Sequence, residues 1–352
     1  MRSVVCICVC LVLATYSAAQ TDTTTGGNKS VVGVLTTLQR KSLKSEVASI
    51  LYDPVKCDSE GSVYYTTDAT GSSVLRKLSL SGERLAEFRP GANPEKPIDL
   101  FQDYTISPDG EVFMLVFPHE IDRYIFAYKP DGSFHSSVKL DTGFPWIPTA
   151  IAAFPSGGFL IGGLEYAKSD KGKLTQVPFT GIFSADGRLL KELKLEDDDD
   201  IADFAASGDP RVVSPAGNNR AIEFTKMEAA QDGNIYLMRW TNPAIVYAIS
   251  AGGSVVRRFL VDPHNSNDRP ISMHVAENRI AVLFTTSDIR ADVMRVLDLE
   301  GHLQGTYSEV VNEKTDERLG AAFACFTNNP ARFVFFSVNQ NNYLDLQIAE
   351  PR

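Results

Sequence analysis

Residues 107–132, SPDGEVFMLVFPHEIDRYIFAYKPDG, open and close on the same Pro-Asp-Gly turn. Glycine tolerates the positive φ that tight hairpin turns require, and Pro and Asp favour the positions before it. Two runs rich in β-branched and aromatic residues, VFMLVF and RYIFAY, lie between the turns. Such runs are typical of β-strands. The stretch therefore predicts two strands joined by the loop PHEID, with a tight turn at the outer end of each.

The same turn-and-strand pattern recurs along the chain. First turns, each followed by a strand-like run, occur in SEGSVYYTT (59–67), SPDGEVFML (107–115), FPSGGFLIG (154–162), AQDGNIYLM (230–238), AENRIAVLF (276–284) and NNPARFVFF (328–336). A second turn follows each of the first five, within residues 78–88, 128–140, 183–195, 249–260 and 297–307. Each unit therefore predicts a four-stranded antiparallel meander.

The first turns are 45 to 52 residues apart, except for one step of 76 residues between Gly157 and Gly233. We interpret this step as one unit with a polar insertion at about 196–224, and an unrecognised seventh unit is the alternative. Six such units predict an all-β fold, a six-bladed β-propeller of four-stranded antiparallel blades, because a ring lets every sheet pack against its neighbours. A pair of β-sandwiches is the alternative fold, but it does not explain the regular pairs of turns. The one candidate helix is LQRKSLKSEVASI (38–50).

The two ends of the chain suggest how the ring closes. The sixth unit has only three strand-like runs, GAAFACFTN, ARFVFFSV and YLDLQIA. An orphan run, KSVVGVLTTLQ (29–39), precedes the first unit. We expect this N-terminal strand to complete the last blade and close the ring, so that residues 29–352 form a single β-propeller domain.

The first residues have the pattern of a cleavable signal peptide. Arg2 precedes an apolar run at 4–14, and Ser17-Ala18-Ala19 supplies small residues for cleavage. We therefore expect a signal peptide at 1–19, a flexible N-terminal tail at 20–28, and a secreted or periplasmic protein. The apolar run is too short for a membrane span, and the formal net charge of −10 argues against nucleic acid and anionic membranes as partners. A monomer is expected.

Cys57 and Cys325 are the two cysteines that follow the expected cleavage site. Both fall late in the predicted innermost strand of a unit, the first and the last, which ring closure makes neighbours. An oxidising compartment permits a disulfide, so the pair is a candidate lock on the ring. Two free thiols are the alternative, because innermost strands of adjacent blades can lie too far apart for a bond.

Candidate ligand-binding residues come from the longer loops of the predicted ring. These loops lie on the face opposite the tight turns, around the mouth of the central channel, where we expect a ligand pocket. The expected channel-mouth residues are His119, Glu120, Asp122, Trp146, Asp170, Arg239, Trp240, Asn242, His264, Asp288 and Arg290.

The two tryptophans, the PHEID loop and an acidic run each have a structural alternative. Trp146 and Trp240 could stack on a sugar or cap an apolar ligand, or each could pack beneath its own proline-flanked loop. PHEID (118–122) offers a histidine and two carboxylates for a metal or for acid–base chemistry, or it is a solvated loop. DDDD (197–200) makes calcium a possible ligand, but consecutive carboxylates cannot all turn inward, and a solvated acidic run is the alternative. No cofactor is predicted.

The S-P-D-G, Q-D-G-N-I-Y and K-P-D-G turns resemble those of the NHL/TolB-like group of six-bladed β-propellers, across the whole chain after the signal peptide. VYYTTD (63–68) also looks like one copy of the YWTD blade signature. Some members of this broad group are calcium- or zinc-dependent lactonases and arylesterases and others are lyases, but the resemblance gives no residue-by-residue match to their metal ligands, so no catalytic residue is carried over. We therefore expect an exported binding module whose loop-rich channel face takes a protein, peptide or glycan. The alternative is a metal-dependent hydrolase of the lactonase or arylesterase type.

Overall fold

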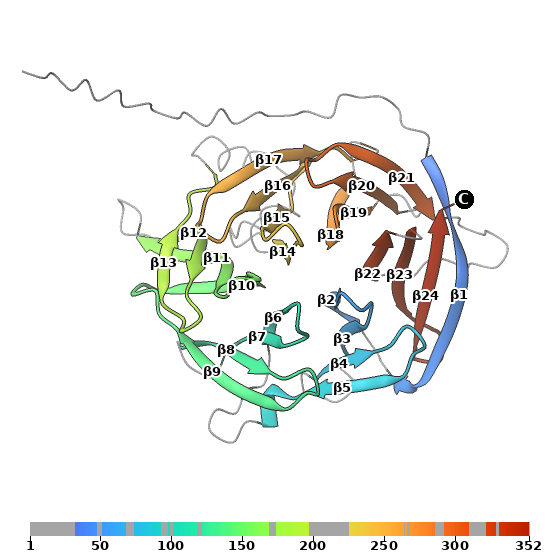
Figure 1. Cartoon of the computed structure of the whole chain (residues 1–352), viewed down its shortest axis with the longest axis horizontal. Helices are drawn as coiled ribbons and strands as arrows, with labels where there is room; N and C mark the ends of the chain where they lie inside the picture. The colour runs from blue at the N-terminus through green and yellow to red at the C-terminus, as the bar shows by residue number, and fades with distance from the viewer. Residues whose placement is uncertain are drawn as a thin grey trace, which may run out of the picture.

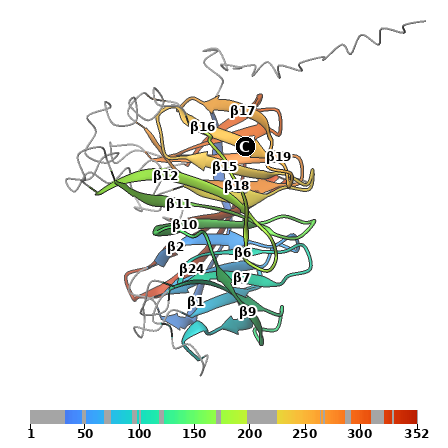
Figure 2. The same ribbon diagram turned by 90° about the vertical axis from the view of Figure 1, so that its left-hand side faces the viewer.

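The computed structural model describes residues 32–47, 51–67, 74–92, 98, 101–117, 122–168, 174–196, 225–263, 265, 268–285, 292–309, 322–328 and 331–351. These residues form five β-sheets arranged as a propeller, with β2, β6, β10, β14, β18 and β22 nearest its centre (Figure 1). The view turned by 90° shows the same sheets edge-on, fanned around the ring (Figure 2). Within the described ranges the single helical element is the 3-10 turn Pro90–Ala92.

Four of the sheets are antiparallel meanders whose strand order follows the chain. The first holds β2 (Leu51–Cys57), β3 (Val63–Thr67), β4 (Leu75–Leu78) and β5 (Arg84–Phe88). The second holds β6 (Phe101–Ile106), β7 (Val112–Val116), β8 (Arg123–Tyr128) and β9 (Phe134–Leu140). The third holds β10 (Trp146–Ala153), β11 (Phe159–Lys168), β12 (Leu174–Phe183) and β13 (Leu189–Glu192). The fourth holds β14 (Lys226–Ala229), β15 (Ile235–Arg239), β16 (Ala244–Ile249) and β17 (Val255–Val261). Beyond residue 196, the expected insertion at 196–224 lies outside the described residues.

The fifth sheet has eight strands, in the order β18-β19-β20-β21-β1-β24-β23-β22. Its strands are β18 (Arg269–Ala276), β19 (Arg279–Thr285), β20 (Val293–Asp298), β21 (Leu303–Glu309), β1 (Val32–Val47), β24 (Tyr343–Pro351), β23 (Ala331–Val338) and β22 (Ala322–Asn328). The expectation of six separate four-stranded blades is therefore corrected to four such sheets and one of eight strands. The physical reason is that β1 forms hydrogen bonds along both of its edges, in parallel with β21 and antiparallel with β24.

The N-terminal strand pairs with the last unit, as the sequence predicts. In β1, Leu35 lies opposite Pro351 and Leu43 lies opposite Leu344 of β24. The candidate helix at 38–50 is wrong, because β1 continues as a strand to Val47. The edge of β24 supplies hydrogen-bond partners along this segment, and that tertiary pairing outweighs its local helical composition.

The second Pro-Asp-Gly turn of the opening stretch has a tertiary role that the first lacks. Gly132 has a φ of +88°, and a Cβ there would lie 2.2 Å from the carbonyl oxygen of Glu87 in the preceding sheet. Gly187 repeats the arrangement, with a Cβ position 2.2 Å from the carbonyl oxygen of Lys139. Only glycine fits such a turn, because it needs both the left-handed backbone and the close approach. These outer turns therefore help to seat each sheet against the one before it.

The hydrophobic core lies between neighbouring sheets rather than in one central mass. Between the first and second sheets, for example, Tyr64 and Phe88 pack with Tyr104, Phe126 and Tyr128. Comparable buried clusters occupy the other contacts between successive units around the ring. This packing leaves the innermost strands to line the channel.

Candidate binding site in the central channel

Charged side chains connect the innermost strands on the channel wall. Lys56 of β2 forms an ion pair with Asp103 of β6, with 3.0 Å between Nζ and Oδ1, and also donates to the carbonyl oxygen of Tyr104. Asp103 Oδ2 in turn accepts the N–H of Ile151 in β10 at 2.8 Å. Lys56 and Asp103 are both buried. Because a buried charge needs partners, this pair stabilises three neighbouring innermost strands.

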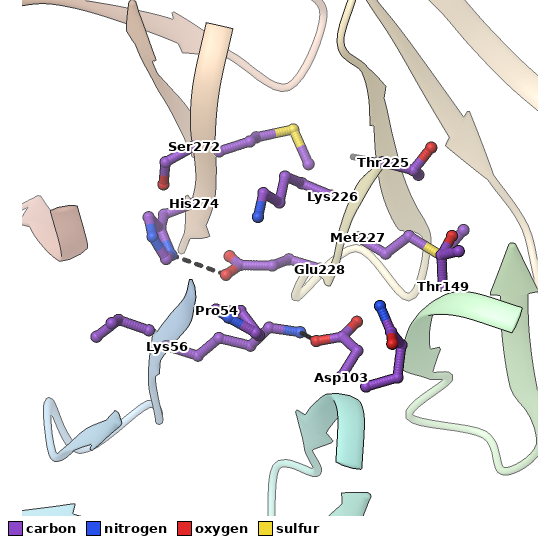
Figure 3. Close-up of a pocket in the computed structure, with 13 residues that line it drawn as sticks. Pro54, Lys56, Asp103, Thr149, Thr225, Lys226, Met227, Glu228, Ser272 and His274 are labelled. Atoms are coloured by element: carbon purple, nitrogen blue, oxygen red, sulfur yellow. Dashed lines mark ion pairs between the residues drawn. The ribbon is translucent and has the colours of Figure 1, made fainter. Parts of the chain in front are cut away.

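A second set of contacts lies across the channel, on β14, β18 and β22. Glu228 of β14 approaches His274 Nδ1 of β18 to 2.8 Å through Oε1, and its Oε2 accepts the N–H of Val275 at 2.6 Å. His274 Nε2 lies 3.0 Å from the carbonyl oxygen of Phe323 in β22. Figure 3 shows both pairs, Lys56–Asp103 and Glu228–His274, facing the same pocket.

These contacts follow the repeat of the sequence. Each joins residues 47 to 49 positions apart on neighbouring innermost strands, in the pairs Lys56–Tyr104, Asp103–Ile151, Thr105–Ala153, Glu228–Val275 and His274–Phe323. Each bond is made by a side chain of one unit to the backbone of the next. The innermost strands are therefore joined to one another by bonds outside the regular sheet pairing.

These bonds join four of the six pairs of neighbouring innermost strands, and the junction between the last and first units is covalent. Cys325 of β22 and Cys57 of β2 form a disulfide with 5.7 Å between their Cα atoms. The two residues are 268 positions apart in sequence. The disulfide therefore joins innermost strands that the chain itself does not connect.

Arg239, an expected channel-mouth residue, lies instead between the third and fourth sheets. Its side chain is fully buried, and Nε lies 2.6 Å from Glu196 Oε1. It also donates to Thr225 Oγ1 at 2.7 Å and to Thr180 Oγ1 at 3.1 Å. Burial of the nearby Tyr247 hydroxyl raises its pKa to about 12, and the negative charge of Glu196 adds to this rise. The binding assignment of Arg239 is therefore corrected to a structural one, because its bonds to Glu196 and Thr180 hold the third sheet to the fourth.

Two cavities with shared lining residues, Lys56, Met227, Glu228 and His274, lie in the channel among the described residues. The smaller, of about 200 Å³, is lined near the starts of the innermost strands by Lys56, Asp103, Thr149, Lys226, Glu228, Ser272 and His274, among others (Figure 3). The larger, of about 600 Å³, lies at the ends of these strands, where the first tight turns begin. Its wall combines apolar groups such as Ile106, Pro108, Pro155, Val275 and Phe326 with the polar groups of Lys56, Glu228 and His274. Asp58, Gln231 and Glu277 add further polar groups to the wall. A concave site that combines apolar surface with placed polar groups is typical of ligand sites.

The other expected site residues that the structure describes do not gather at one point. Trp146 is buried against Phe179 and Phe183, with ring centroids 5.0 and 5.6 Å away, so its assignment to the channel mouth is corrected to the core. Asp122 forms an exposed ion pair with Lys139 of the outer strand β9 at 2.8 Å. Asn242, which precedes a cis proline, donates to the carbonyl oxygen of Asp268 at 3.1 Å.

Neither described cavity is lined by Trp240. Six expected residues lie outside the described ranges, and the structure does not place them: His119, Glu120, Asp170, His264, Asp288 and Arg290. The acidic run at 197–200, proposed for calcium, is also outside them. In the part of the chain that is described, no three His, Cys, Asp or Glu side chains are grouped as a metal site.

Lys56, Asp103 and Glu228 were not among the expected site residues. Each stands in a strand-like run, where an isolated charge is normally assigned to the solvent face of a sheet. A signal was nevertheless present, because Lys56 and Asp103 are 47 residues apart, close to the repeat length. A charge recurring at the repeat length in the innermost strand indicates a contact between units.

No helix among the described residues is both long and apolar enough to cross a membrane. No known protein-family profile matches the chain, and no curated protein matches its sequence. A protein of unknown function from Bacteroides caccae is 14% identical, with 72% of this chain and 80% of that one aligned and a TM-score of 0.45. The WD40 domain of Neurospora crassa Pan2 is 9% identical over 90% and 94% of the two chains, with a TM-score of 0.40. A prolyl endopeptidase is 14% identical over 84% of this chain and 47% of its own, with a TM-score of 0.37.

Proposed function

We propose that this chain is an exported binding module that holds a peptide segment of its partner in the wider end of the central channel. The observation that carries the proposal is the cavity of about 600 Å³, to which segments from units all around the ring contribute. A cavity of this size accommodates a few side chains of an extended peptide. Because the wall is built from cross-linked strands, it is pre-organised, which lowers the entropy that binding costs.

A peptide fits this wall better than a glycan does. Carbohydrate sites usually present exposed aromatic faces, and the two tryptophans expected to supply them do not line either described cavity. Phe326, Ile106 and Val275 offer contacts to apolar side chains, while Lys56, Glu228 and His274 offer polar ones. This wall supports a partner that combines apolar side chains with backbone amides.

The proposal includes the finer points of architecture and location. We infer that the eight-stranded sheet acts as two blades, β18–β21 and β22–β24 with β1, which gives a ring of six like that of the NHL/TolB-like group. Support comes from the antiparallel pairing within each half and the short parallel pairing, Val32–Leu35 with Thr306–Glu309, between them. Secretion and a monomeric state belong to the same proposal. The cavity of about 600 Å³ lies at the tight-turn end of the channel, so the proposed site differs from the loop-rich face that the sequence favoured.

Selection from a displayed peptide library tests the binding function. We expect the purified full chain to enrich peptides with a shared apolar motif. Gln231→Trp, an exposed turn residue that lines the cavity, should weaken binding by about tenfold or more, since a tenfold loss needs only about 1.4 kcal/mol. Ala251→Trp is the matched control, because Ala251 lies exposed in the outer tight turn of the same unit.

Failure to enrich any motif, or equal effects of the two tryptophans, would contradict the assignment. The hydrolase alternative has its own readout in elemental analysis of the purified protein. Stoichiometric calcium or zinc together with lactone or aryl-ester hydrolysis would replace the binding proposal.

A further inference from the structure

The Cys57–Cys325 disulfide forms part of the wall of the large cavity. Both cysteines line it, beside Lys56, Asp58 and Phe326. Cys57 is partly exposed, whereas Cys325 is buried, with 7% of its surface accessible. A small molecule that enters the cavity therefore meets the disulfide from the side of Cys57.

The disulfide lies at a junction that also holds a cluster of buried apolar side chains. Val55, Val63 and Tyr65 of the first unit pack there against Val334 and Phe336 of the last. The side chain-to-backbone bonds described for the other junctions join Lys56, Asp103, Thr105, Glu228 and His274 to strands within the continuous chain. Opening the disulfide would remove the covalent link between β22 and β2, while the apolar packing at the junction and the pairing of β1 with β24 would stay.

We propose that this disulfide is a thiol-exchange site, open through the channel to low-molecular-mass thiols and closed to thiols on proteins, and that its reduction loosens the ring at the β22–β2 junction. In the first step a small thiolate attacks Cys57 Sγ along the S–S axis. A mixed disulfide forms on Cys57, the Cys57–Cys325 bond breaks, and Cys325 leaves as a thiolate that takes up a proton. A second thiol molecule releases Cys57 and carries both electrons away as a symmetrical small-molecule disulfide.

The inference does not depend on the peptide-binding proposal, because its chemistry is read directly from the cysteines. The purified, oxidised full chain is incubated with 2-mercaptoethanol, quenched with acid, alkylated and mapped by mass spectrometry. We expect adducts on Cys57 and not on Cys325. The reaction should proceed in native buffer at a rate that hardly changes between zero and low urea.

A reduced thioredoxin is the size control. It should react at least about a hundredfold more slowly per thiolate, because a protein thiol cannot follow the channel. If the disulfide instead reacts only after global unfolding, the rates for both thiols will rise together and steeply, by about tenfold or more per molar urea. That result, or adducts mainly on Cys325, would overturn the proposed site.

Hydrogen exchange tests the loosening of the ring. Reduced wild-type protein and the Cys57→Ser/Cys325→Ser double variant should both lose protection in β2 and β22 while β10, on the far side of the channel, keeps it (Figure 1). If the two forms lose protection equally, the loss is caused by the absence of the disulfide and not by the serine substitutions. Unchanged exchange in β2 and β22 after complete reduction would contradict a loosening role.

Discussion

Arg239 illustrates how far a single side chain determines the packing of two sheets. Its guanidinium has no exposed surface and bonds to Glu196, Thr180 and Thr225, which come from different segments of the chain. The Glu196 side chain is itself only 4% exposed. Removal of one partner from such a pair leaves the other as an uncompensated buried charge, which is far more costly than loss of a surface pair.

We expect Arg239→Met to lower the free energy of unfolding by about 3–5 kcal/mol. Arg188→Met is the matched control, because the Arg188–Asp186 pair is largely exposed and should contribute about 0–1 kcal/mol. Urea unfolding monitored by tryptophan fluorescence gives both values. The double variant Arg239→Met/Glu196→Gln should recover part of the loss, and equal effects of the two single changes would contradict a structural role for Arg239.

The sequence alone could not predict that Arg239 is buried and structural, because its partner Glu196 is 43 residues away in the chain. Local pattern places Arg239 where a strand gives way to the loop Trp240-Thr241-Asn242, and a charge at that point looks solvent-facing. Lys56 and Asp103 were missed for the same reason. Their partners lie on the next unit, and only the ring brings them together.

Among the elements, the seam between β1 and β24 closes the ring on its outer side. Arg40 of β1 binds Asp345 of β24 through Nε and Nη2, at 3.0 and 2.8 Å. Burial alone would raise the pKa of the Asp345 carboxyl, but hydrogen bonds from Arg40, Asn339 and Ser42 outweigh it and hold that pKa below its ordinary value. The seam is therefore stabilised by the ionised carboxylate.

This depressed pKa makes the seam sensitive to acid. Its contribution is fully present above the unfolded carboxyl pKa of about 4 and is lost as the pH falls through the lower folded value. We expect Arg40→Met to cost about 1–2 kcal/mol at neutral pH, and the difference from wild type to shrink in acid. Urea unfolding at several pH values checks this. Lys139→Met, which breaks an exposed pair with Asp122, should show no such trend, and a penalty for Arg40→Met that does not change with pH would contradict the account.

Deletion of β1 tests the same seam more severely. A chain that begins at residue 48 leaves the edges of β24 and β21 without their shared partner, and exposed edges promote association. We expect this truncation to aggregate or to unfold without cooperativity, whereas a chain that begins at residue 29 should unfold like the wild type. Sedimentation and thermal unfolding of the two proteins decide it. If the shorter chain were monomeric and unfolded cooperatively, β1 would be dispensable.

The sequence predicted the hairpins and their strands well, because the residues that determine them are local. Turn glycines such as Gly110 and Gly132 mark hairpins wherever they occur, and the strands β7 and β8 between them lie where the apolar runs are. The number of separate sheets could not be predicted, because it depends on whether β1 pairs along one edge or two. The parallel pairing of β1 with β21 spans only Val32 to Leu35. The two strands are far apart in the sequence, so no hairpin turn between them indicates the pairing.

For the whole molecule, two independent closures hold the ring. One is the β1 strand at the rim, and the other is the Cys57–Cys325 disulfide at the channel. Because the disulfide closes a loop of 268 residues, its removal should cost about 2–5 kcal/mol, chiefly by freeing the unfolded chain. Thermal unfolding of Cys57→Ser/Cys325→Ser beside oxidised wild type measures this, and an unchanged midpoint would mean that the outer closure alone suffices.

Closure of the ring is the premise of both the channel and the binding proposal. Peptide mapping of the purified, non-reduced protein tests it, because Cys57 and Cys325 meet only if the first and last units are neighbours. We predict one intramolecular cross-linked peptide pair containing both cysteines in the monomer. Two free thiols that alkylate without reduction, or pairing between separate chains, would contradict a ring closed in this way.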